Sequence, residues 1–229
     1  MSDRHALVTG ANRGLGLEFV RQLLARGDRI TATARDPGRA DALQAIAAGA
    51  RQRLASHALD VADAGAHAAF AAALHAPLDL VVHNAGVLVS GERFGAVRAD
   101  DLERSLRTNA LGPFLLTQAL APRLAPGAKV VAISSGLGSI GEADGFSTPS
   151  YRLSKAALNM AVVQLAHALR ERGVAVVALC PGWVRTDMGG AGAPLQPAES
   201  VSAMLATVDA LDIARSGAFL DRRGATKAW

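Results

Sequence analysis

The chain has 229 residues, which is enough for one α/β domain with a sizeable core, and we expect a single domain over residues 1–229. Half of the residues are hydrophobic and 19% are charged, which excludes a disordered chain, and no apolar run approaches the ~18 residues that span a membrane. The formal net charge of +4 comes from scattered arginines with few aromatic residues, so no nucleic-acid or membrane partner is expected.

Short β-branched runs alternate with longer alanine- and leucine-rich segments along the chain. The pattern predicts strands over residues 6–8, 30–34, 53–59, 78–82, 129–133, 174–179 and 218–220. It predicts helices over residues 15–26, 39–48, 63–74, from 100 or 101 past 109, 150–171 and 197–211. Asp100 or Asp101 is expected to cap the fourth helix, and Gly112 and Pro113 to disturb it. The alternation predicts a doubly wound parallel sheet of about seven strands, flanked by helices on both faces.

Polar residues and glycines follow six of the predicted strands. In chain order these are the glycine turn 9–16, Arg35, Asp60, residues 84–86, Ser134 with Ser135, and residues 181–186. The carboxyl ends of parallel strands meet at one edge of a sheet, and ligands bind there. We therefore expect a ligand site assembled from these residues.

The glycine turn has the spacing G-x-x-x-G-x-G. Glycines at such a strand–helix turn allow close approach of a pyrophosphate, which the free N–H groups of the helix then meet. A tight turn without a ligand is the alternative. The residues expected to bind a dinucleotide here are Gly10, Asn12, Arg13, Gly14, Leu15 and Gly16.

The residue that distinguishes NADP from NAD is expected about 20 positions further on, at the end of the second strand. Arg35 lies there and can pair with a 2′-phosphate, and Arg13 can approach the same group. Asp36 offers two alternatives, since it can bind a 2′-hydroxyl or simply initiate a turn before Pro37. We expect NADP(H) to be favoured, with NAD(H) possible.

Tyr151 and Lys155 are four positions apart on a predicted helix and therefore share a face. A free tyrosine has a pKa near ~10, and a fixed cation beside it is expected to lower the phenol pKa toward the working range. The alternative is a partly exposed helix face with an extended lysine.

With residues 9–16, 84–86, Asn109, Ser135, Tyr151 and Lys155 in this order, the chain resembles the short-chain dehydrogenase/reductase family over essentially its whole length. Residues 151–159, 181–190, 197–201, 216–221 and Trp229 are similar to the subgroup of C-factor-like proteins and sniffer-type carbonyl reductases. The resemblance implies a Rossmann fold and an NADP(H)-dependent oxidoreductase acting on a carbonyl or alcohol. It also implies a homodimer or homotetramer, with the helices that start near Asp100 and Ser150 at the interface.

The resemblance also implies catalytic roles. Tyr151 would be the general acid/base, and Lys155 would lower its pKa and bind the nicotinamide ribose. Ser135 would hold the substrate oxygen, and Asn109 would support a water chain that resupplies protons. Ser134 and Ser139 are rivals to Ser135, and Asn109 has the alternative of a hydrogen bond within a bent helix.

Cofactor contacts follow from the same resemblance. Asp60 and Val61 would meet the adenine, and Asn84, Ala85 and Gly86 would line the groove, together with Tyr151 and Lys155. From the loop after the sixth strand, the expected contacts are Pro181, Gly182, Val184 and Thr186. A cap on the next helix is the alternative for Asp60, and a plain loop role for Thr186.

The sequence departs from the family pattern at two places. His83 replaces the first of two asparagines that usually precede Ala-Gly, and we expect it to be a packed histidine. Sixteen positions separate Ser135 from Tyr151, where thirteen are usual, and the extra residues fall within 142–149.

Two functions compete with a reductase: a catalytically weak NAD(P)-binding sensor or signalling protein of the C-factor type, and a lyase or epimerase that uses the same tyrosine. The six histidines and Cys180 lack metal-ligand spacing, so no metal is expected. A single cysteine fits a reducing cytoplasm. The small residues of 189–196 predict a mobile loop that covers the site.

Overall fold

The computed structural model describes residues 4–50 and 52–229. Within these residues, seven strands form one sheet in the order β3-β2-β1-β4-β5-β6-β7, and every neighbouring pair is parallel. The strands are β1 (His5–Thr9), β2 (Arg29–Ala34), β3 (Leu54–Ala58), β4 (Leu78–His83), β5 (Leu124–Ile133), β6 (Ala175–Cys180) and β7 (Phe219–Asp221). The predicted doubly wound parallel sheet is confirmed.

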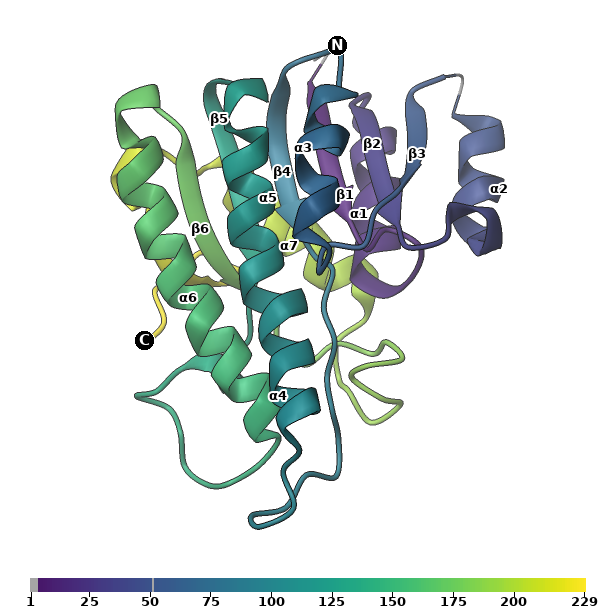
Figure 1. The fold of residues 1–229 in the computed structure, drawn as a ribbon. Coiled ribbons are helices and arrows are strands. Elements are labelled where there is room, and N and C mark those ends of the chain that lie inside the picture. The colour runs from purple at the N-terminus through teal and green to yellow at the C-terminus, as the bar shows by residue number, and fades with distance from the viewer. Residues whose placement is uncertain (1–3, 51) are drawn as a thin grey trace.

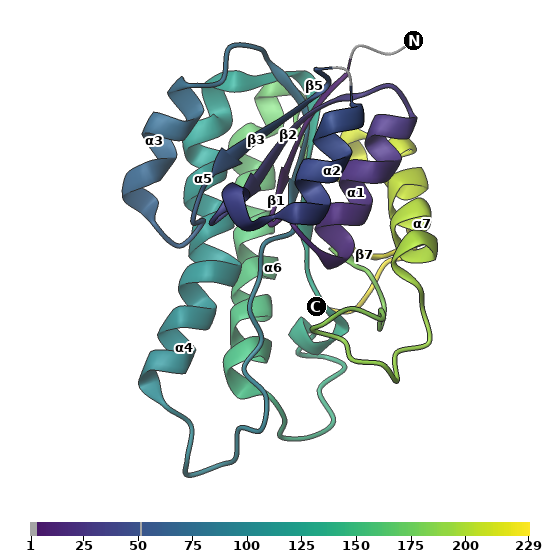
Figure 2. The same ribbon diagram turned by 90° about the vertical axis from the view of Figure 1, so that its right-hand side faces the viewer.

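Helices cover both faces of the sheet and form a three-layer structure (Figures 1 and 2). The helices are α1 (Gly14–Ala25), α2 (Asp41–Gly49), α3 (Ala64–Ala72), α4 (Ala99–Leu106), α5 (Gly112–Leu120), α6 (Pro149–Leu169) and α7 (Pro197–Asp209). One face carries α1, α2 and α7, and the other carries α3, α5 and α6.

Two apolar cores lie between these layers, and alternate residues of each buried strand point into them. Along β1, Ala6 and Val8 pack into the core beneath α1 and α7, whereas Leu7 packs into the core beneath α5 and α6. The largest contributors are Phe19 on the first side and Phe219 on the second, both fully buried. This two-sided burial explains why the strands are continuous apolar runs.

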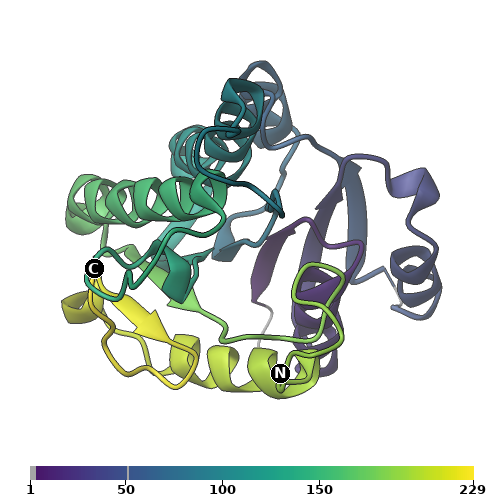
Figure 3. The same ribbon diagram turned by 90° about the horizontal axis from the view of Figure 1, so that it is seen from below.

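The strand order reverses beside β1. The chain moves outward from β1 through β2 to β3, and then returns to place β4 on the other side of β1, with Ala6 opposite Leu80. A crevice opens at the carboxyl ends of strands where the order reverses in this way, and ligands of open α/β sheets bind there. Figure 3 looks onto this edge of the molecule.

The fourth predicted helix differs from its prediction in two respects. It begins at Ala99 with Arg98 at the N-cap, so Asp100 and Asp101 lie in the first turn and do not cap it. Their carboxylates instead complement the positive end of the helix dipole. The disturbance is a π-helical segment, Arg107–Leu111, which ends where Gly112 and Pro113 start α5.

The other elements agree with their predictions to within a few residues, except that β5 begins earlier, at Leu124. Among the described residues, no helix combines the length and the apolar character needed to cross a membrane.

Candidate active site

Helix α6 presents Tyr151 and Lys155 at its first two turns, and both side chains are buried. Pro149 starts the helix, as its fixed φ favours. The carboxylate of Glu92, from the loop after β4, accepts hydrogen bonds from the Ser150 N–H at 3.2 Å and from the Ser150 hydroxyl. A side chain distant in sequence therefore caps the helix immediately before Tyr151.

Burial controls the protonation of both groups. It raises the pKa of Tyr151 to about 12, and a hydrogen bond with Ser135 opposes this shift. Burial also lowers the pKa of Lys155 to about 8. The structure therefore does not show the predicted lowering of the phenol pKa, because desolvation of the phenolate outweighs the other contributions. Near neutral pH the phenol is protonated, which is the form that a general acid needs.

The Lys155 ammonium lies 5.6 Å from the centre of the Tyr151 ring. It donates one hydrogen bond, of 2.7 Å, to the carbonyl oxygen of Ile133 at the end of β5. An ammonium has three N–H groups, so two of them are available for further partners. A Cβ atom added at Gly86 would lie 3.9 Å from Lys155 Nζ, which brings the end of β4 into the same site.

Ser134, Ser135 and Ser139 differ in their hydrogen-bond partners. Ser134 donates its hydroxyl to Asn159 Oδ1 at 2.7 Å, and Ser139 donates to the carbonyl oxygen of Trp229 at 3.3 Å. The Ser135 oxygen accepts from the Leu137 N–H at 3.1 Å, which leaves its own proton free to donate. Ser135 is also the serine in contact with Tyr151.

The short 3₁₀ helix Gly136–Gly138 follows Ser135 and packs on α6. A Cβ atom added at Gly138 would lie 2.7 Å from Lys155 Cβ, so only glycine allows this approach. Asn159 Nδ2 donates to the Gly138 carbonyl at 3.2 Å. These contacts fix the serine loop against the helix that carries the tyrosine.

Asn109 lies in the π-helical segment and is fully buried. Its Oδ1 accepts from the Val87 N–H at 2.8 Å, and its Nδ2 donates to the Val87 carbonyl at 2.8 Å and to Ser154 Oγ at 2.9 Å. Its partners are therefore the loop after β4 and helix α6, and not its own bent helix. Asn109 clamps these two elements together beside Lys155.

The crevice between β1 and β4 is held by Thr9 and Asn84. Thr9 Oγ1 accepts from the N–H groups of Asn84 and Ala85, each at 3.1 Å. Asn84 Nδ2 donates to the carbonyl oxygens of Thr9 and Gly10, each at 3.0 Å. A Cβ atom at Gly16 would overlap Asn84 Nδ2 and the Gly10 carbonyl, so the helix start sits against this network.

The glycine turn fits a pyrophosphate. Gly10 has a φ of +62°, and a Cβ atom there would lie 2.8 Å from Ala85 Cα. No side chain caps the start of α1 at Arg13, and this helix end has N–H groups free for an anion. Asn12 is exposed in the turn, whereas Leu15 is half-buried against the core.

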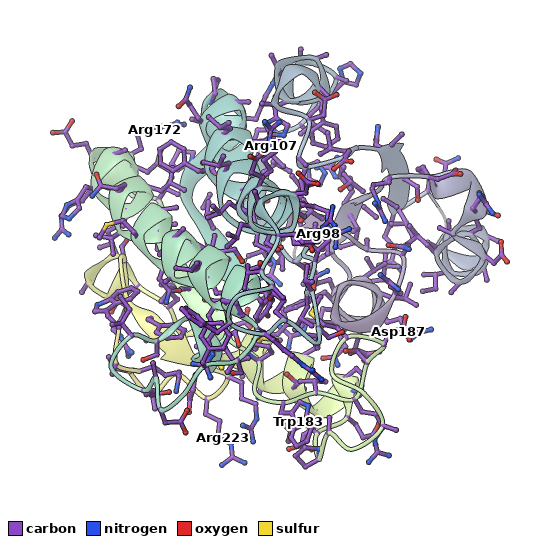
Figure 4. All side chains as sticks on the ribbon, turned by 60° about the horizontal axis from the view of Figure 1, so that its bottom comes forward. Arg98, Arg107, Arg172, Trp183, Asp187 and Arg223 are labelled. Atoms are coloured by element: carbon purple, nitrogen blue, oxygen red, sulfur yellow. The ribbon has the colours of Figure 1, made fainter. Side chains whose placement is uncertain are left out.

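Arg35 and Asp36, which follow β2, have different surroundings. Asp36 accepts from the Gly38 N–H at 3.0 Å and starts a 3₁₀ turn at Pro37, which matches the turn-initiator alternative. Arg35 is exposed immediately after the strand. Arg13 forms an exposed ion pair of 3.1 Å with Asp187, which lies near the start of α1 (Figure 4).

Asp60 and Val61 follow β3. Asp60 Oδ1 accepts from the Ala62 N–H at 2.9 Å in a local turn. The cap of α3 is Asp63, which accepts from the Gly65 N–H at 3.0 Å, so the alternative that Asp60 caps this helix is wrong. Val61 is buried beneath Gly112.

The loop after β6 folds back toward the glycine turn. Thr186 Cγ2 would lie 3.4 Å from a Cβ atom at Gly14, and Thr186 Oγ1 accepts from the Gly189 N–H at 3.1 Å. Val184 is buried and pairs with Leu195 in an isolated bridge. Backbone hydrogen bonds run from the Arg185 N–H to the Leu195 carbonyl and from the Gly190 N–H to the Thr186 carbonyl.

Pro181 and Gly182, the remaining predicted cofactor contacts, lie at the start of this loop. The Pro181 carbonyl accepts from Ser200 Oγ at 2.8 Å, which fixes it to α7, and Gly182 has a φ of +81°. Trp183 is 61% exposed and lies at the surface (Figure 4). Its indole N–H donates to the Gly189 carbonyl at 2.8 Å.

His83 is packed in the core, as predicted. Its Nε2 bonds to Thr117 Oγ1 at 2.7 Å, and Thr117 donates its own proton to the Pro113 carbonyl. Nε2 must therefore carry the proton, and burial lowers the pKa of His83 to about 3. Its Nδ1 has no hydrogen-bond partner among the described residues.

Several functional contacts were missed by the sequence. Thr9 and Ser154 bond directly to the predicted site residues Asn84 and Asn109. Glu92 and Asn159 bond to Ser150 and Gly138, which lie beside the predicted site residues. Asn159 and Ser154 lie within the resembling segment 151–159, which could have indicated them, but nothing local to Glu92 predicts its contact with Ser150. Among the described residues there is no cluster of three or more histidine, cysteine, aspartate or glutamate side chains suited to a metal ion.

Comparison with known proteins agrees with this arrangement. A family model described as short chain dehydrogenase matches residues 4–194. The C-signal of Myxococcus xanthus is 41% identical over 155 residues, which cover 67% of this chain and 93% of that protein.

Two solved structures are similar over 100% of both chains. The NADPH-bound carbonyl reductase from chicken fatty liver is 37% identical, with a TM-score of 0.94. The carbonyl reductase Sniffer of D. melanogaster is 31% identical, with a TM-score of 0.93. The chain therefore belongs to the short-chain dehydrogenase/reductase family of oxidoreductases, and within it to the C-signal and Sniffer-like subgroup that the sequence resembles.

Proposed function

We propose that this protein is an NADP(H)-dependent carbonyl reductase or alcohol dehydrogenase in which Tyr151 is the general acid/base. The observation that carries the proposal is the burial of Tyr151 and Lys155 on one helix, with Ser135 in contact with the phenol. The fit of the glycine turn to a pyrophosphate and the NADPH held by the chicken relative support the cofactor.

In the reductive direction, NADPH bound in this groove would supply a hydride to the carbonyl carbon. Ser135 donates a hydrogen bond to the carbonyl oxygen, and Tyr151 transfers its proton to that oxygen as negative charge develops there, which yields the alcohol. The Lys155 ammonium stabilises the phenolate that remains. Asn109 holds the loop after β4 against α6 and supports the water chain that returns a proton to Tyr151 through Lys155.

The other predicted residues bind the cofactor. The turn containing Gly10, Asn12, Arg13, Gly14, Leu15 and Gly16 receives the pyrophosphate. Arg35 pairs with the 2′-phosphate, while Asp60 and Val61 border the adenine. The remainder of the groove is formed by Asn84, Ala85, Gly86, Pro181, Gly182, Val184 and Thr186.

A signalling role is the second candidate, because the C-signal of Myxococcus xanthus is 41% identical to this chain. A protein that only senses the dinucleotide needs the groove but not the acid/base group. NADPH oxidation with a panel of aldehydes, ketones and quinones separates the two functions. Turnover with at least one carbonyl is the expected result, whereas tight NADPH binding without turnover would favour the sensor.

We also propose that the protein forms a homodimer or homotetramer in the cytoplasm. Helix α6 exposes Leu153 and Met160, with 54% and 60% of their surface accessible, and these residues supply an apolar contact for a second copy. Light scattering during size-exclusion chromatography measures the assembly, and a monomeric mass would contradict it.

A further inference from the structure

The loop that carries Ser135 is long, and the far end of its outer half contacts Arg152 and Phe94. It connects Ile133, the end of β5, to Pro149, the start of α6. The inner half is held by bonds between Ser135, Leu137 and Gly138 and by its packing on α6. The outer half is exposed, with Ile140 and Phe146 accessible over 76% and 55% of their surface.

A segment distant in sequence supports this outer half. The Lys227 ammonium donates to both carboxylate oxygens of Glu142, each at 2.8 Å. The carbonyl oxygen of Trp229 accepts from the Gly141 N–H at 2.7 Å and from the Ser139 hydroxyl at 3.3 Å. Figure 3 shows the yellow C-terminal segment beside the green loop that follows β5. Residues 226–229 therefore bind the serine loop by three contacts.

The supporting segment is itself fixed to the sheet. The Lys227 N–H donates to the Phe219 carbonyl on β7 at 2.8 Å. The Trp229 ring stacks on Phe219, with ring centroids 5.7 Å apart and planes 24° apart, and Phe219 is 1% exposed. These contacts hold the backbone of Lys227 against a buried strand. The Lys227 ammonium is therefore a fixed hydrogen-bond donor for Glu142.

The ion pair lies directly beside the residue that follows Ser135. A Cβ atom added at Gly136 would lie 3.7 Å from Glu142 Oε2 and 3.8 Å from Lys227 Cε. Glu142 also donates its backbone N–H to Ser139 Oγ at 3.1 Å, which closes the loop on itself. Displacement of Glu142 would therefore change the packing next to Ser135 and the turn that fixes its hydroxyl.

We propose that Lys227, through its ion pair with Glu142, is a positioning residue that holds the Ser135 loop in the geometry that receives the substrate oxygen. The inference rests on the proposed function of Ser135 and assigns no catalytic contact to Lys227. Exposed ion pairs contribute little to stability, so the effect is expected on turnover more than on unfolding. The hydrogen bond that Lys227 donates to Glu142 raises the pKa of Lys227, so its ammonium is charged at neutral pH.

Three variants test the ion pair: Lys227→Met, Glu142→Gln, and the double variant Lys227→Glu with Glu142→Lys. Because misplacement of a substrate-binding group is costly to rate, each single variant is expected to lower kcat/KM for the carbonyl about tenfold. The charge-reversed double variant is expected to recover most of this loss. The Kd for NADPH and the Tm are expected to stay near the wild-type values. The matched control is Arg26→Met, which removes an ion pair of 2.8 Å with Asp209 far from the site.

Hydrogen–deuterium exchange of the same proteins provides a readout independent of turnover. Amides of residues 137–142 are expected to exchange faster in Lys227→Met than in wild type, and unchanged in Arg26→Met. Wild-type protein that reduces no carbonyl would contradict the proposed function, and exchange would still decide whether the pair orders the loop. Unchanged exchange, or unchanged kcat/KM in an active enzyme, would overturn the inference about Lys227.

Discussion

The Lys155 ammonium lies 5.6 Å from the centre of the Tyr151 ring, but its hydrogen bond goes to the Ile133 carbonyl. The lysine is thus held by β5 at a fixed distance from the phenol and not by the phenol itself. Its burial weakens its own protonation, while burial of Tyr151 keeps the phenol protonated. Near neutral pH the phenol therefore carries a proton, and we expect the activity to depend on the charge on Lys155.

The pH dependence of kcat/KM for NADPH tests this link, because that ratio reports groups that titrate in the free enzyme. Burial lowers the pKa of Lys155 to about 8, so the ammonium is lost as the pH rises through this value. Its attraction for the anionic cofactor is lost with it. We expect kcat/KM to fall above a pH of about 8. A profile that stays flat to pH 10 would show that Lys155 does not titrate in this range.

Arg35→Ala is expected to raise the KM for NADPH much more than the KM for NADH. Charge-assisted hydrogen bonds contribute about 1.5–3 kcal/mol, which corresponds to a preference of about tenfold or more. Asp36 is engaged with the Gly38 N–H, so Arg35 is the side chain available to read the 2′ position. Steady-state kinetics with both cofactors provide the measurement, with Arg39→Ala in the following turn as control. Equal changes for both cofactors would show that Arg35 does not read the 2′-phosphate.

Asn109→Ala is expected to lower the free energy of unfolding by about 2–3 kcal/mol, since it leaves buried partners unsatisfied. The lost bonds are those to the Val87 N–H, the Val87 carbonyl and Ser154 Oγ. Urea denaturation followed by circular dichroism gives the value. Asn12→Ala, at an exposed position, is the control and is expected to change stability by less than about 0.5 kcal/mol. Equal unfolding free energies of the two variants would show that the hydrogen bonds of Asn109 do not stabilise the fold.

His83 is expected to make the fold sensitive to acid. Burial lowers its pKa from 6.5 to about 3, so between these values the unfolded chain binds a proton that the native chain excludes. The unfolding free energy therefore falls as the pH drops through this window, by up to about 1.4 kcal/mol per pH unit from this group. Urea denaturation from pH 7 to 4 measures the slope, and His83→Asn is expected to reduce it. An equal pH dependence of the unfolding free energy in wild type and His83→Asn would show that His83 does not cause the acid sensitivity.

The sequence was sufficient for the fold because burial on both faces makes each strand of a parallel sheet a continuous apolar run. The strand order, with β4 beside β1, was not predicted from periodicity. Local patterns did not predict the π-helical segment Arg107–Leu111 or the N-cap at Arg98. The π-helical segment contains Asn109, whose bonds to Val87 and Ser154 connect residues distant in sequence.

The placement of Tyr151 and Lys155 on one face of a helix was predictable, because their spacing is local to a motif. The site was less predictable where the partner is distant in sequence. The choice among Ser134, Ser135 and Ser139 depends on Asn159 and Trp229, which a local pattern does not connect to them. The effect of burial on the pKa of Tyr151 was not predictable from the motif either, since the degree of burial is a property of the folded chain.

The most direct test of the account is Tyr151→Phe, which removes the hydroxyl and keeps the ring. The variant is expected to lower kcat for NADPH-dependent carbonyl reduction by about 10²–10⁴-fold, the usual contribution of a general acid. NADPH binding, measured by fluorescence titration, is expected to stay within about threefold of wild type, because the contacts that we propose for the glycine turn and Arg35 are unchanged in the variant. A variant that binds NADPH and reduces the same carbonyl at the wild-type rate would contradict the central claim that Tyr151 donates the proton.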